Sequence, residues 1–490
     1  MSRRLDPKKA VCIVYVAAMF VVAMDATILN VVLKTISDEF HIPPAASGAL
    51  NVGYLVSIAI VLPLAGWLGD RWGTKRIFLL ALAIFTGASV LCGTAGDVHS
   101  LIFYRILQGI GGGLITPLGM AMLFRTFPPQ ERAKISRSLV LPIAIAPAVG
   151  PILSGVMVEH LSWRWIFYVN LPLGIAALLL GLLYLQEHKE PEAGHLDIPG
   201  VLLSAPGLGL VMYALSQGPL LGWSSPVIIV AGSVGTVLLA ALVFVELRVQ
   251  KPLLDLRLLQ DRLFRTAGLV AMCSAAGLLG MLYVFPLMYQ HALQASALDA
   301  GLTTFPEALG LMVSSQLVPR FYPRYGPKRI IIVGLLCTSV IFVLLSMVGA
   351  GTNPWLIRGM LFAVGLCLGH TVGAVQIAAF SNVPPASMGR ATTWFAVQNR
   401  LGPAIGMAVL SAIMAAMASG QLTNGAIDAA NAGQLEMNLL AYRTALLGAA
   451  AFLLLGLCAA FRIQDSDTAA TMKSRQSSIP STKPVKTEGG

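Results

Sequence analysis

The stretch GDRWGTKRI, residues 69–77, returns later in the chain as YPRYGPKRI, residues 322–330. The two copies begin 253 positions apart (322 − 69). Three further pairs follow in the same order at nearly the same spacing: FYRIL (103–107) with LIRGM (356–360), PPQERA (128–133) with PPASMGRA (384–391), and APAVG (146–150) with GPAIG (402–406). Ordered matches of this kind indicate that the chain consists of two related halves.

The composition between these motifs is that of a polytopic membrane protein. Of the 490 residues, 56% are hydrophobic and only 11% are charged, whereas soluble domains carry about 25% charged residues. Apolar runs recur along almost the whole chain, each long enough to cross a hydrocarbon core of about 30 Å. The sequence predicts an all-α fold with fourteen spans, centred within 11–33, 48–68, 77–96, 100–122, 137–158, 164–185, 197–217, 225–246, 266–290, 299–319, 329–349, 354–378, 392–416 and 440–462.

The spacing of the repeat sets the domain plan. An offset of 253 residues is too long for six spans with short loops, so two extra spans must separate the halves. We expect a cytoplasmic N-terminus (1–10), a six-helix bundle (11–190), two linker spans (195–250), a second six-helix bundle (262–462) and a disordered cytoplasmic tail (463–490).

The net charge of +11 is explained by membrane topology rather than by nucleic-acid binding. Basic residues gather in alternate loops, such as the one with Lys75 and Arg76, while the opposite loops hold few. The positive-inside rule therefore predicts that both termini are cytoplasmic. No group of His, Cys or acidic residues has metal-ligand spacing, and the six cysteines read as small buried hydrophobes.

Several motifs resemble those of one family. GWLGDRWGTKR (66–76), YRILQGIGGG (104–113), GPILSG (150–155), MDATILNVVL (24–33) and WRWIFYVNLPLG (163–174) are similar to signatures of the major facilitator superfamily, and in particular of its fourteen-span drug:proton antiporters of the EmrB/QacA type. The resemblance covers roughly residues 10–462. It implies the major facilitator fold, with two six-helix bundles plus two linker helices, and transport by alternating access.

The fifth expected span carries prolines inside an apolar run, and it resembles the antiporter motif of this family. Pro147, Gly150, Pro151 and Gly155 fall within LVLPIAIAPAVGPILSG (139–155). Proline removes a helix donor and bends the helix, while glycine allows helices to approach closely in lipid. We expect a bent helix that seals the interface between the halves, with an ordinary proline kink as the alternative.

The loop between the second and third expected spans predicts an inner gate. Asp70 could accept hydrogen bonds at a helix N-terminus in the other half, where the helix dipole favours an anion. Gly66 and Gly73 fit close packing and a tight turn, and Arg71 belongs to the same motif. Since the repeat has Pro323 in place of Asp70, we expect the gate on one side only. A purely topological role remains the alternative for the basic residues.

Charges within spans are expensive, so each is a functional hypothesis. Asp25 and Arg105 lie at similar depths in the first and fourth spans, which line the cavity in the family that the chain resembles. They are a candidate proton and substrate pair, because a nearby cation favours the ionised acid and burial disfavours it. A static structural pair is the alternative. Gln108 extends the face of Arg105. Glu307 is a second proton site, a cation contact or a structural partner of Arg358 or Arg400.

The sequence therefore predicts a secondary transporter and not an enzyme, without catalytic residues, metal or cofactor, and with the proton as coupling ion. No GxxxxGK[ST], HExxH or GxSxG motif occurs. We expect a proton-driven exporter of lipophilic drugs or toxic small molecules, cationic ones among them, in the bacterial inner membrane. The alternatives are a dedicated exporter of one metabolite and an uptake symporter. We expect a monomer; a periplasmic adaptor and an outer-membrane channel stay open as partners.

Overall fold

A computed structural model describes the fold over most of the chain. It covers residues 6–41, 44–128, 131, 145–146, 149–150, 153–154, 156–190, 194–249, 252–293, 295, 297–349, 351–422 and 432–464. Every regular element within these residues is a helix, so the prediction of an all-α membrane protein is confirmed. The predicted tail, 463–490, lies outside the described residues beyond Gln464.

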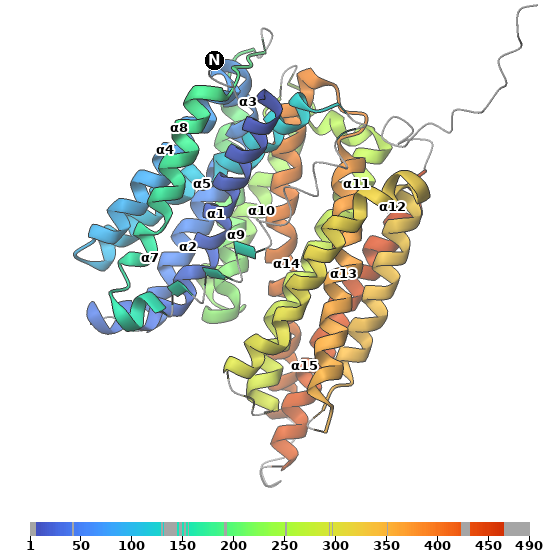
Figure 1. The fold of residues 1–490 in the computed structure, drawn as a ribbon. Coiled ribbons are helices and arrows are strands. Elements are labelled where there is room, and N and C mark those ends of the chain that lie inside the picture. The colour runs from blue at the N-terminus through green and yellow to red at the C-terminus, as the bar shows by residue number, and fades with distance from the viewer. Residues whose placement is uncertain are drawn as a thin grey trace, which may run out of the picture.

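The first half of the chain forms one group of helices, drawn in blue to green in Figure 1. Aspartates begin two of its long helices: Asp6 caps the first, and Asp97 accepts hydrogen bonds from the backbone of His99 and Ser100 at the start of another. The helices are α1 (Pro7–Glu39), α2 (Pro44–Val61), α3 (Leu64–Trp72), α4 (Thr74–Thr94), α5 (Val98–Thr126), α7 (Trp165–Tyr168) and α8 (Asn170–Tyr184).

Two helices then form a hairpin, which we call the linker hairpin. α9 (Ile198–Leu221) and α10 (Pro226–Glu246) pack against each other, and α9 also contacts α2 and α14. Much of the outer face of α10 is exposed and apolar, including Val230 and Val237. Such a face suits contact with lipid.

The second half forms the other group of helices, yellow to red in Figure 1. It begins after a short 3-10 turn, η1 (Leu256–Gln260), and includes another, η3 (Pro385–Ser387), and a π-helical turn, η2 (Met288–Ala292). Its α-helices are α11 (Arg262–Leu287), α12 (Ala297–Ser346), α13 (Pro354–Ala379), α14 (Met388–Leu422) and α15 (Ala432–Ala460).

The described helices match the expected spans with two differences. Eleven are long and apolar enough to cross a membrane, or twelve if the bent pair α2 and α3 counts as one span. That pair bends by 55° next to Pro63, which cannot continue the helical hydrogen bonding. The expected loop between 299–319 and 329–349 is reduced to a kink at Gly326 (φ 76°, ψ 162°), where the backbone is not helical and α12 divides into two helices that correspond to these two spans. Most of the expected fifth span, 137–158, lies outside the described residues.

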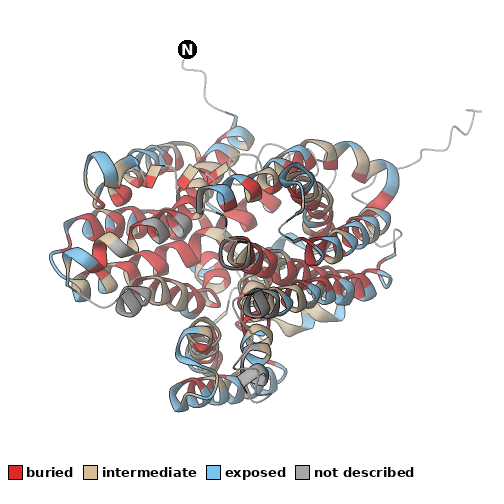
Figure 2. Ribbon diagram, turned by 90° about the horizontal axis from the view of Figure 1, so that it is seen from below, coloured by how far each residue is buried: buried red, intermediate tan, exposed pale blue. Residues whose placement is uncertain are grey.

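The two groups meet at one end of the molecule. α14 of the second half contacts α3 and α5 of the first, and the helices of the two groups diverge towards the opposite end in Figure 1. Viewed along the helices, buried residues occupy the interior of the groups and exposed residues their outer faces (Figure 2). The end where the groups meet carries the Asp70 motif, as described below.

Candidate functional sites: a buried charge network and a gate

The structure brings Asp25 and Arg105 together as a buried ion pair. Asp25 lies on α1 and Arg105 on α5, and Arg105 Nη1 is 2.7 Å from Asp25 Oδ2. The side chains are 0% and 1% exposed, respectively. A pair so far from water gains from a strong Coulomb attraction, but each charge has lost its hydration. The site therefore depends on further polar groups around the pair.

Three residues supply these polar groups, and with the pair they form what we call the charge network. Gln108 Nε2 donates to Asp25 Oδ1 at 2.9 Å, and Gln108 Oε1 accepts from Arg105 Nη1 at 2.7 Å. Asn170, the first residue of α8, donates to the same Asp25 oxygen at 3.3 Å and to Ser89 at 3.1 Å. The carboxylate is therefore held by donors from two helices.

Close packing of α2 against α5 completes the network. The ring of Tyr54, on α2, lies 4.2 Å from the Arg105 guanidinium. A Cβ on Gly109 would collide with Ser57 and lie 2.5 Å from the Tyr54 carbonyl oxygen, so only glycine allows this approach. Within the described residues, Arg105 Nε, Arg105 Nη2 and the Tyr54 hydroxyl are buried without hydrogen-bond partners. Unused buried donors are rare in folded proteins, so this side of Arg105 is a place where an acceptor would bind.

Glu307 does not join this network. It lies on α12, is 5% exposed, and its Oε1 atom has no hydrogen-bond partner within the described residues. Arg358, one of its expected partners, lies 4.9 Å from the ring of Trp355 instead. The ion pairs of the described residues include Glu307 with neither Arg358 nor Arg400. The interpretation of Glu307 as a structural ion-pair partner is therefore wrong for this conformation.

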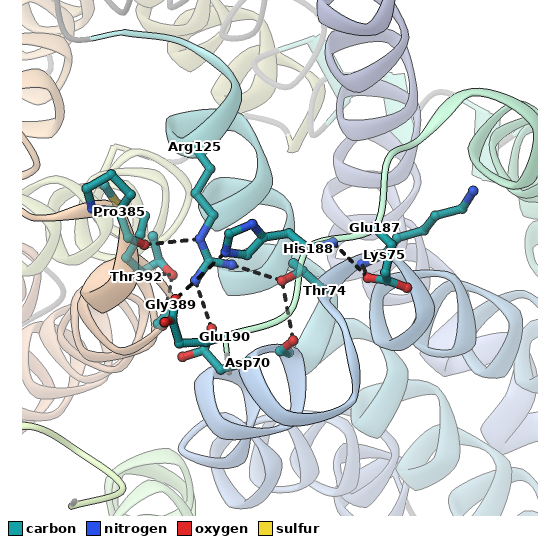
Figure 3. A network of polar contacts seen from close by, with 12 residues as sticks. Asp70, Thr74, Lys75, Arg125, Glu187, His188, Glu190, Pro385, Gly389 and Thr392 are labelled. Carbon is teal, nitrogen blue, oxygen red and sulfur yellow. Dashed lines mark hydrogen bonds and ion pairs between the residues drawn. The ribbon is translucent and has the colours of Figure 1, made fainter. Parts of the chain in front are cut away.

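The second site is at the end where the two groups of helices meet (Figure 3). Arg125, near the end of α5, donates from Nη2 to Asp70 Oδ1 at 2.8 Å and from Nη1 to Thr74 at 2.9 Å. Its Nε donates to the carbonyl oxygen of Pro385 in the other half at 3.2 Å. We call Asp70, Thr74 and Arg125, with Pro385 and the first turn of α14, the gate.

The expected contact between Asp70 and a helix N-terminus is present in a modified form. A Cβ on Gly389, in the first turn of α14, would lie 2.7 Å from Asp70 Oδ1. A Cβ on Gly66 would lie 2.9 Å from the Gly389 carbonyl oxygen, so both glycines are needed for this packing. The hydrogen bond to the Asp70 carboxylate comes from Arg125 rather than from the helix backbone. Arg125 therefore bridges the halves, a role that sequence reasoning did not assign to it.

A turn braces the gate from the first half. Gly73 adopts φ 106°, which favours glycine, and the carboxylate of Glu187 lies against it and accepts from the backbone of Lys75 at 3.0 Å. The backbone of Glu190 donates to the Asp70 carbonyl oxygen at 2.9 Å. Burial and the charge of Arg125 hold the pKa of His188 below its ordinary value. Arg71 is exposed beside this turn.

The proline motif of the expected fifth span lies largely outside the described residues. Pro147, Pro151 and Gly155 are not described, whereas Gly150 is helical and buried. The role of this motif in sealing the halves stays a prediction.

Sequence reasoning missed Asn170, Ser89 and Arg125. Asn170 had a detectable signal, because a lone asparagine in the apolar run IFYVNLPLG is costly unless it has a partner. Arg125 had no such signal, since it lies among basic residues that the positive-inside rule already explains.

Together, the all-helical fold, the buried charges and the gate define a polytopic membrane transporter. The profile of the Major Facilitator Superfamily matches residues 15–407. The chain belongs to the major facilitator superfamily.

Similar proteins narrow the assignment within this superfamily. The chain is 30% identical over 406 residues to a multidrug resistance protein B homolog of Mycobacterium tuberculosis, covering 82% of this chain and 75% of that protein. It is 28% identical to the lincomycin resistance protein LmrB of Listeria monocytogenes (82% and 85% covered) and 29% identical to the putative multidrug resistance protein MdtD of Pectobacterium carotovorum (81% and 84%). These relatives confirm the resemblance to drug:proton antiporters.

Solved structures share the fold. The human organic anion transporter MFSD10 has a TM-score of 0.65 at 15% identity, covering 93% of this chain and all of that chain. The proton:xylose symporter XylE has a TM-score of 0.61 at 15% identity, covering 92% and 94%. At these identities, the likeness shows the fold alone.

Proposed function

We propose that this protein is a proton-driven antiporter that exports lipophilic small molecules, cationic ones among them, by alternating access. The observation that carries the proposal is the charge network, in which Asp25 and Arg105 pair away from water. The names of the relatives point to drugs as the class of substrate, and they favour export over uptake. The proton is the coupling ion, with no other cofactor.

The chemistry follows from how the network holds Asp25. In this conformation Arg105, Gln108 and Asn170 all donate to the Asp25 carboxylate, which stabilises its charge. A movement that draws α5 or α8 away from α1 would remove those donors while the site is still buried, so the carboxylate would take up a proton. Return of the helix would restore the donors to the Asp25 carboxylate and release the proton. Glu307, buried and unpaired, is the second candidate for a proton or cation site.

The gate fits this cycle if both termini are cytoplasmic, in a bacterial inner membrane. The Asp70–Arg125 end then faces the cytoplasm, and the contacts across it keep that side closed. We propose that the protein works as a monomer; an adaptor and an outer channel are further candidate partners. The orientation is testable in a cysteine-free protein: His99→Cys should react with an impermeant thiol reagent added outside intact cells, and Lys189→Cys should not. The reverse pattern would overturn the orientation.

Proton coupling is tested in inside-out vesicles with an acidic interior and a pH-sensitive dye. Adding ethidium, tetraphenylphosphonium or lincomycin should release protons from vesicles that contain the protein. Asp25→Asn keeps the size of the side chain but fixes it as neutral, so it should abolish this release while insertion is unchanged. Substrate-dependent proton release that survives in Asp25→Asn would place the coupling site elsewhere, and absence of release with all three probes would count against drug antiport.

A further inference from the structure

A second unpaired acid besides Glu307 is buried at the end of the linker hairpin. Glu246, the last residue of α10, is 1% exposed. Its Oε1 accepts a hydrogen bond from the Leu254 backbone at 3.1 Å, while its Oε2 is buried with no hydrogen-bond partner within the described residues. A fully ionised carboxylate with one oxygen unsatisfied in this position is costly.

Another carboxylate lies directly beside it. Asp197 is 7% exposed and caps α9 by accepting from Gly200 N at 2.9 Å, and its second oxygen accepts from Leu253 N at 3.4 Å. A Cβ on Gly200 would collide with the Asp197 carboxylate and would lie 2.9 Å from Glu246 Oε1, so the two acids flank the same glycine. Adjacent buried carboxylates resist being ionised together, and a shared proton relieves the repulsion.

Within the described residues, no cation neutralises this pair of acids. In the described part of the chain, neither Asp197 nor Glu246 forms an ion pair. Asp255, the residue that caps η1, adds a third negative charge nearby. Arg390 of α14 is paired with Asp255, and Arg257 donates to the Val249 carbonyl oxygen. Arg248 lies over the ring of Phe244.

The same short segment connects these acids to the gate. Leu253 and Leu254 are bound by the two carboxylates, and the next residue, Asp255, has its Oδ2 atom 3.5 Å from Arg390 Nη1. Arg390 follows Gly389, which packs on the Asp70 carboxylate, and it also interacts electrostatically with Asp70. Any change that displaces the segment 253–255 therefore weakens the ion pair between Asp255 and Arg390, and Arg390 is then held less firmly at the gate.

We propose that Glu246, together with Asp197, is a proton-binding site on the linker hairpin, and that the proton bound there strengthens the gate through Asp255 and Arg390. With the proton present, the segment 253–255 is held and the gate stays closed. Without it, repulsion among the acids loosens the segment and the gate opens more readily. If the gate faces the cytoplasm, an acidic cytoplasm would restrain further proton entry. This role is separate from coupling through Asp25.

The gate can be measured without transport. The sample is a cysteine-free protein in lipid nanodiscs, without substrate or gradient. Spin labels are attached at Lys189→Cys and Ala386→Cys, two exposed positions on opposite sides of the gate. The distribution of distances between the two labels reports how often the gate is closed. All samples carry Asp25→Asn and Glu307→Gln, so that neither of the two acids proposed for transport titrates. Burial and the charge of Arg125 lower the pKa of His188, so this side chain, which is next to one of the labels, titrates at a lower pH than an ordinary histidine.

We expect the closed population to fall by about half or more as the pH is raised from about 6 to about 8, a range that buried, adjacent carboxyl groups can reach. Glu246→Gln, which mimics the protonated acid, should remain at the acidic value throughout. Asp255→Asn should lower the closed population at both pH values and remove the pH response. Glu159→Gln, the same change at an exposed acid outside the linker hairpin, should respond like the parent. A Glu246→Gln protein that titrates like the parent would overturn the proposal.

Infrared spectroscopy tests the proton itself, even if a variant changes the gate for another reason. The parent protein should show a protonated carboxyl C=O band that disappears over the same pH range. In the same Asp25→Asn, Glu307→Gln background, that band should be missing in Glu246→Gln and retained in Glu159→Gln. If the band is present in Glu246→Gln, the proton is bound elsewhere and the proposal is wrong, whatever the result for drug transport.

Discussion

The two halves of the protein carry equivalent arginines in different surroundings. Arg105 and Arg358 are 253 positions apart (358 − 105), the same offset as the repeated motifs. Arg105 is paired with a carboxylate at 2.7 Å, whereas Arg358 lies 4.9 Å from the ring of Trp355. The duplication therefore preserved the arginine but gave the acid partner to the first half only.

A second pair of equivalent positions differs in the opposite sense. Tyr54 and Glu307 are also 253 apart (307 − 54). Tyr54 packs its ring on Arg105, and the residue at its equivalent position is an acid without a partner. Under the proposed function, the coupling chemistry belongs to the first half, where the acid and the arginine are paired, and the second half offers Glu307 as a separate polar site.

The gate follows the same rule. Gly73 and Gly326, again 253 apart (326 − 73), both have positive φ, at 106° and 76°, so the turn is present twice. The anion is present once, because Pro323 stands where the first half has Asp70. Backbone geometry was copied between the halves, and the charged contact was not.

The largest expected difference between the halves concerns the two arginines. Arg105→Ala leaves Asp25 buried without its cation, and removing one partner of such a pair costs about 3–5 kcal/mol. We expect a large loss of thermal stability and no transport, while Arg358→Ala, which loses a cation–π contact, should cost about 1 kcal/mol. Thermal unfolding of the two purified variants, followed by size-exclusion chromatography, measures both losses of stability. Equal losses of stability in Arg105→Ala and Arg358→Ala would show that the two arginines contribute equally to the two halves.

A double-mutant cycle sharpens this result. If Asp25 and Arg105 act as a unit, the double variant Asp25→Asn with Arg105→Ala should be no worse than the poorer single variant. Additive losses would contradict the pairing.

The next effect is at the gate. Asp70→Asn keeps the side-chain shape but replaces the charge-assisted hydrogen bond to Arg125, a contact worth about 1.5–3 kcal/mol. We expect normal insertion and abundance with export of ethidium reduced about tenfold or more. Arg324→Gln, in the equivalent turn of the second half, should export normally. If Asp70→Asn exports like the parent, the motif has only a topological role.

A smaller and more selective effect is expected at Glu307. Without a partner to lose, Glu307→Gln should leave the thermal stability unchanged or slightly raised. Export of the cations ethidium and tetraphenylphosphonium should fall, while proton release driven by a neutral compound continues. Loss of proton release with every compound would instead make Glu307 part of the coupling site and reverse the assignment of the halves.

The sequence predicted the helical framework well, for a physical reason. Apolar runs must be helical in lipid because each backbone group needs an internal partner, so even the partners Asp25 and Arg105 could be placed by depth along two helices. The features of the helices that the sequence did not predict depend on local backbone geometry. Pro63 breaks a span that its hydropathy shows as continuous, and the link between 299–319 and 329–349 is a kink at Gly326 within α12 rather than a longer loop.

Side-chain partners were harder to predict than spans. Arg125 reaches both Asp70 and Pro385 because α5 ends beside both halves, which no spacing within α5 reveals. Glu307 has arginines at suitable sequence positions and contacts neither. Depth in the membrane can be read from a sequence, but the direction in which a side chain leaves its helix depends on the packing of several helices.

The smallest expected effect separates two asparagines. Asn170 donates to Asp25 at 3.3 Å and to Ser89 at 3.1 Å, whereas Asn399, on α14 of the second half, donates to the Phe395 carbonyl oxygen of its own helix at 3.1 Å. Asn170→Ala should cost about 1–2 kcal/mol, because a charged acceptor loses a buried donor, and it should slow drug-stimulated proton release severalfold. Asn399→Ala should change stability by less than about 0.5 kcal/mol. Both are measured by thermal unfolding and by the vesicle assay. Because Asp25 keeps Arg105 and Gln108 when Asn170 is removed, the loss must stay well below that of Arg105→Ala; equal losses would mean that Asn170, and not the arginine, holds the carboxylate in place.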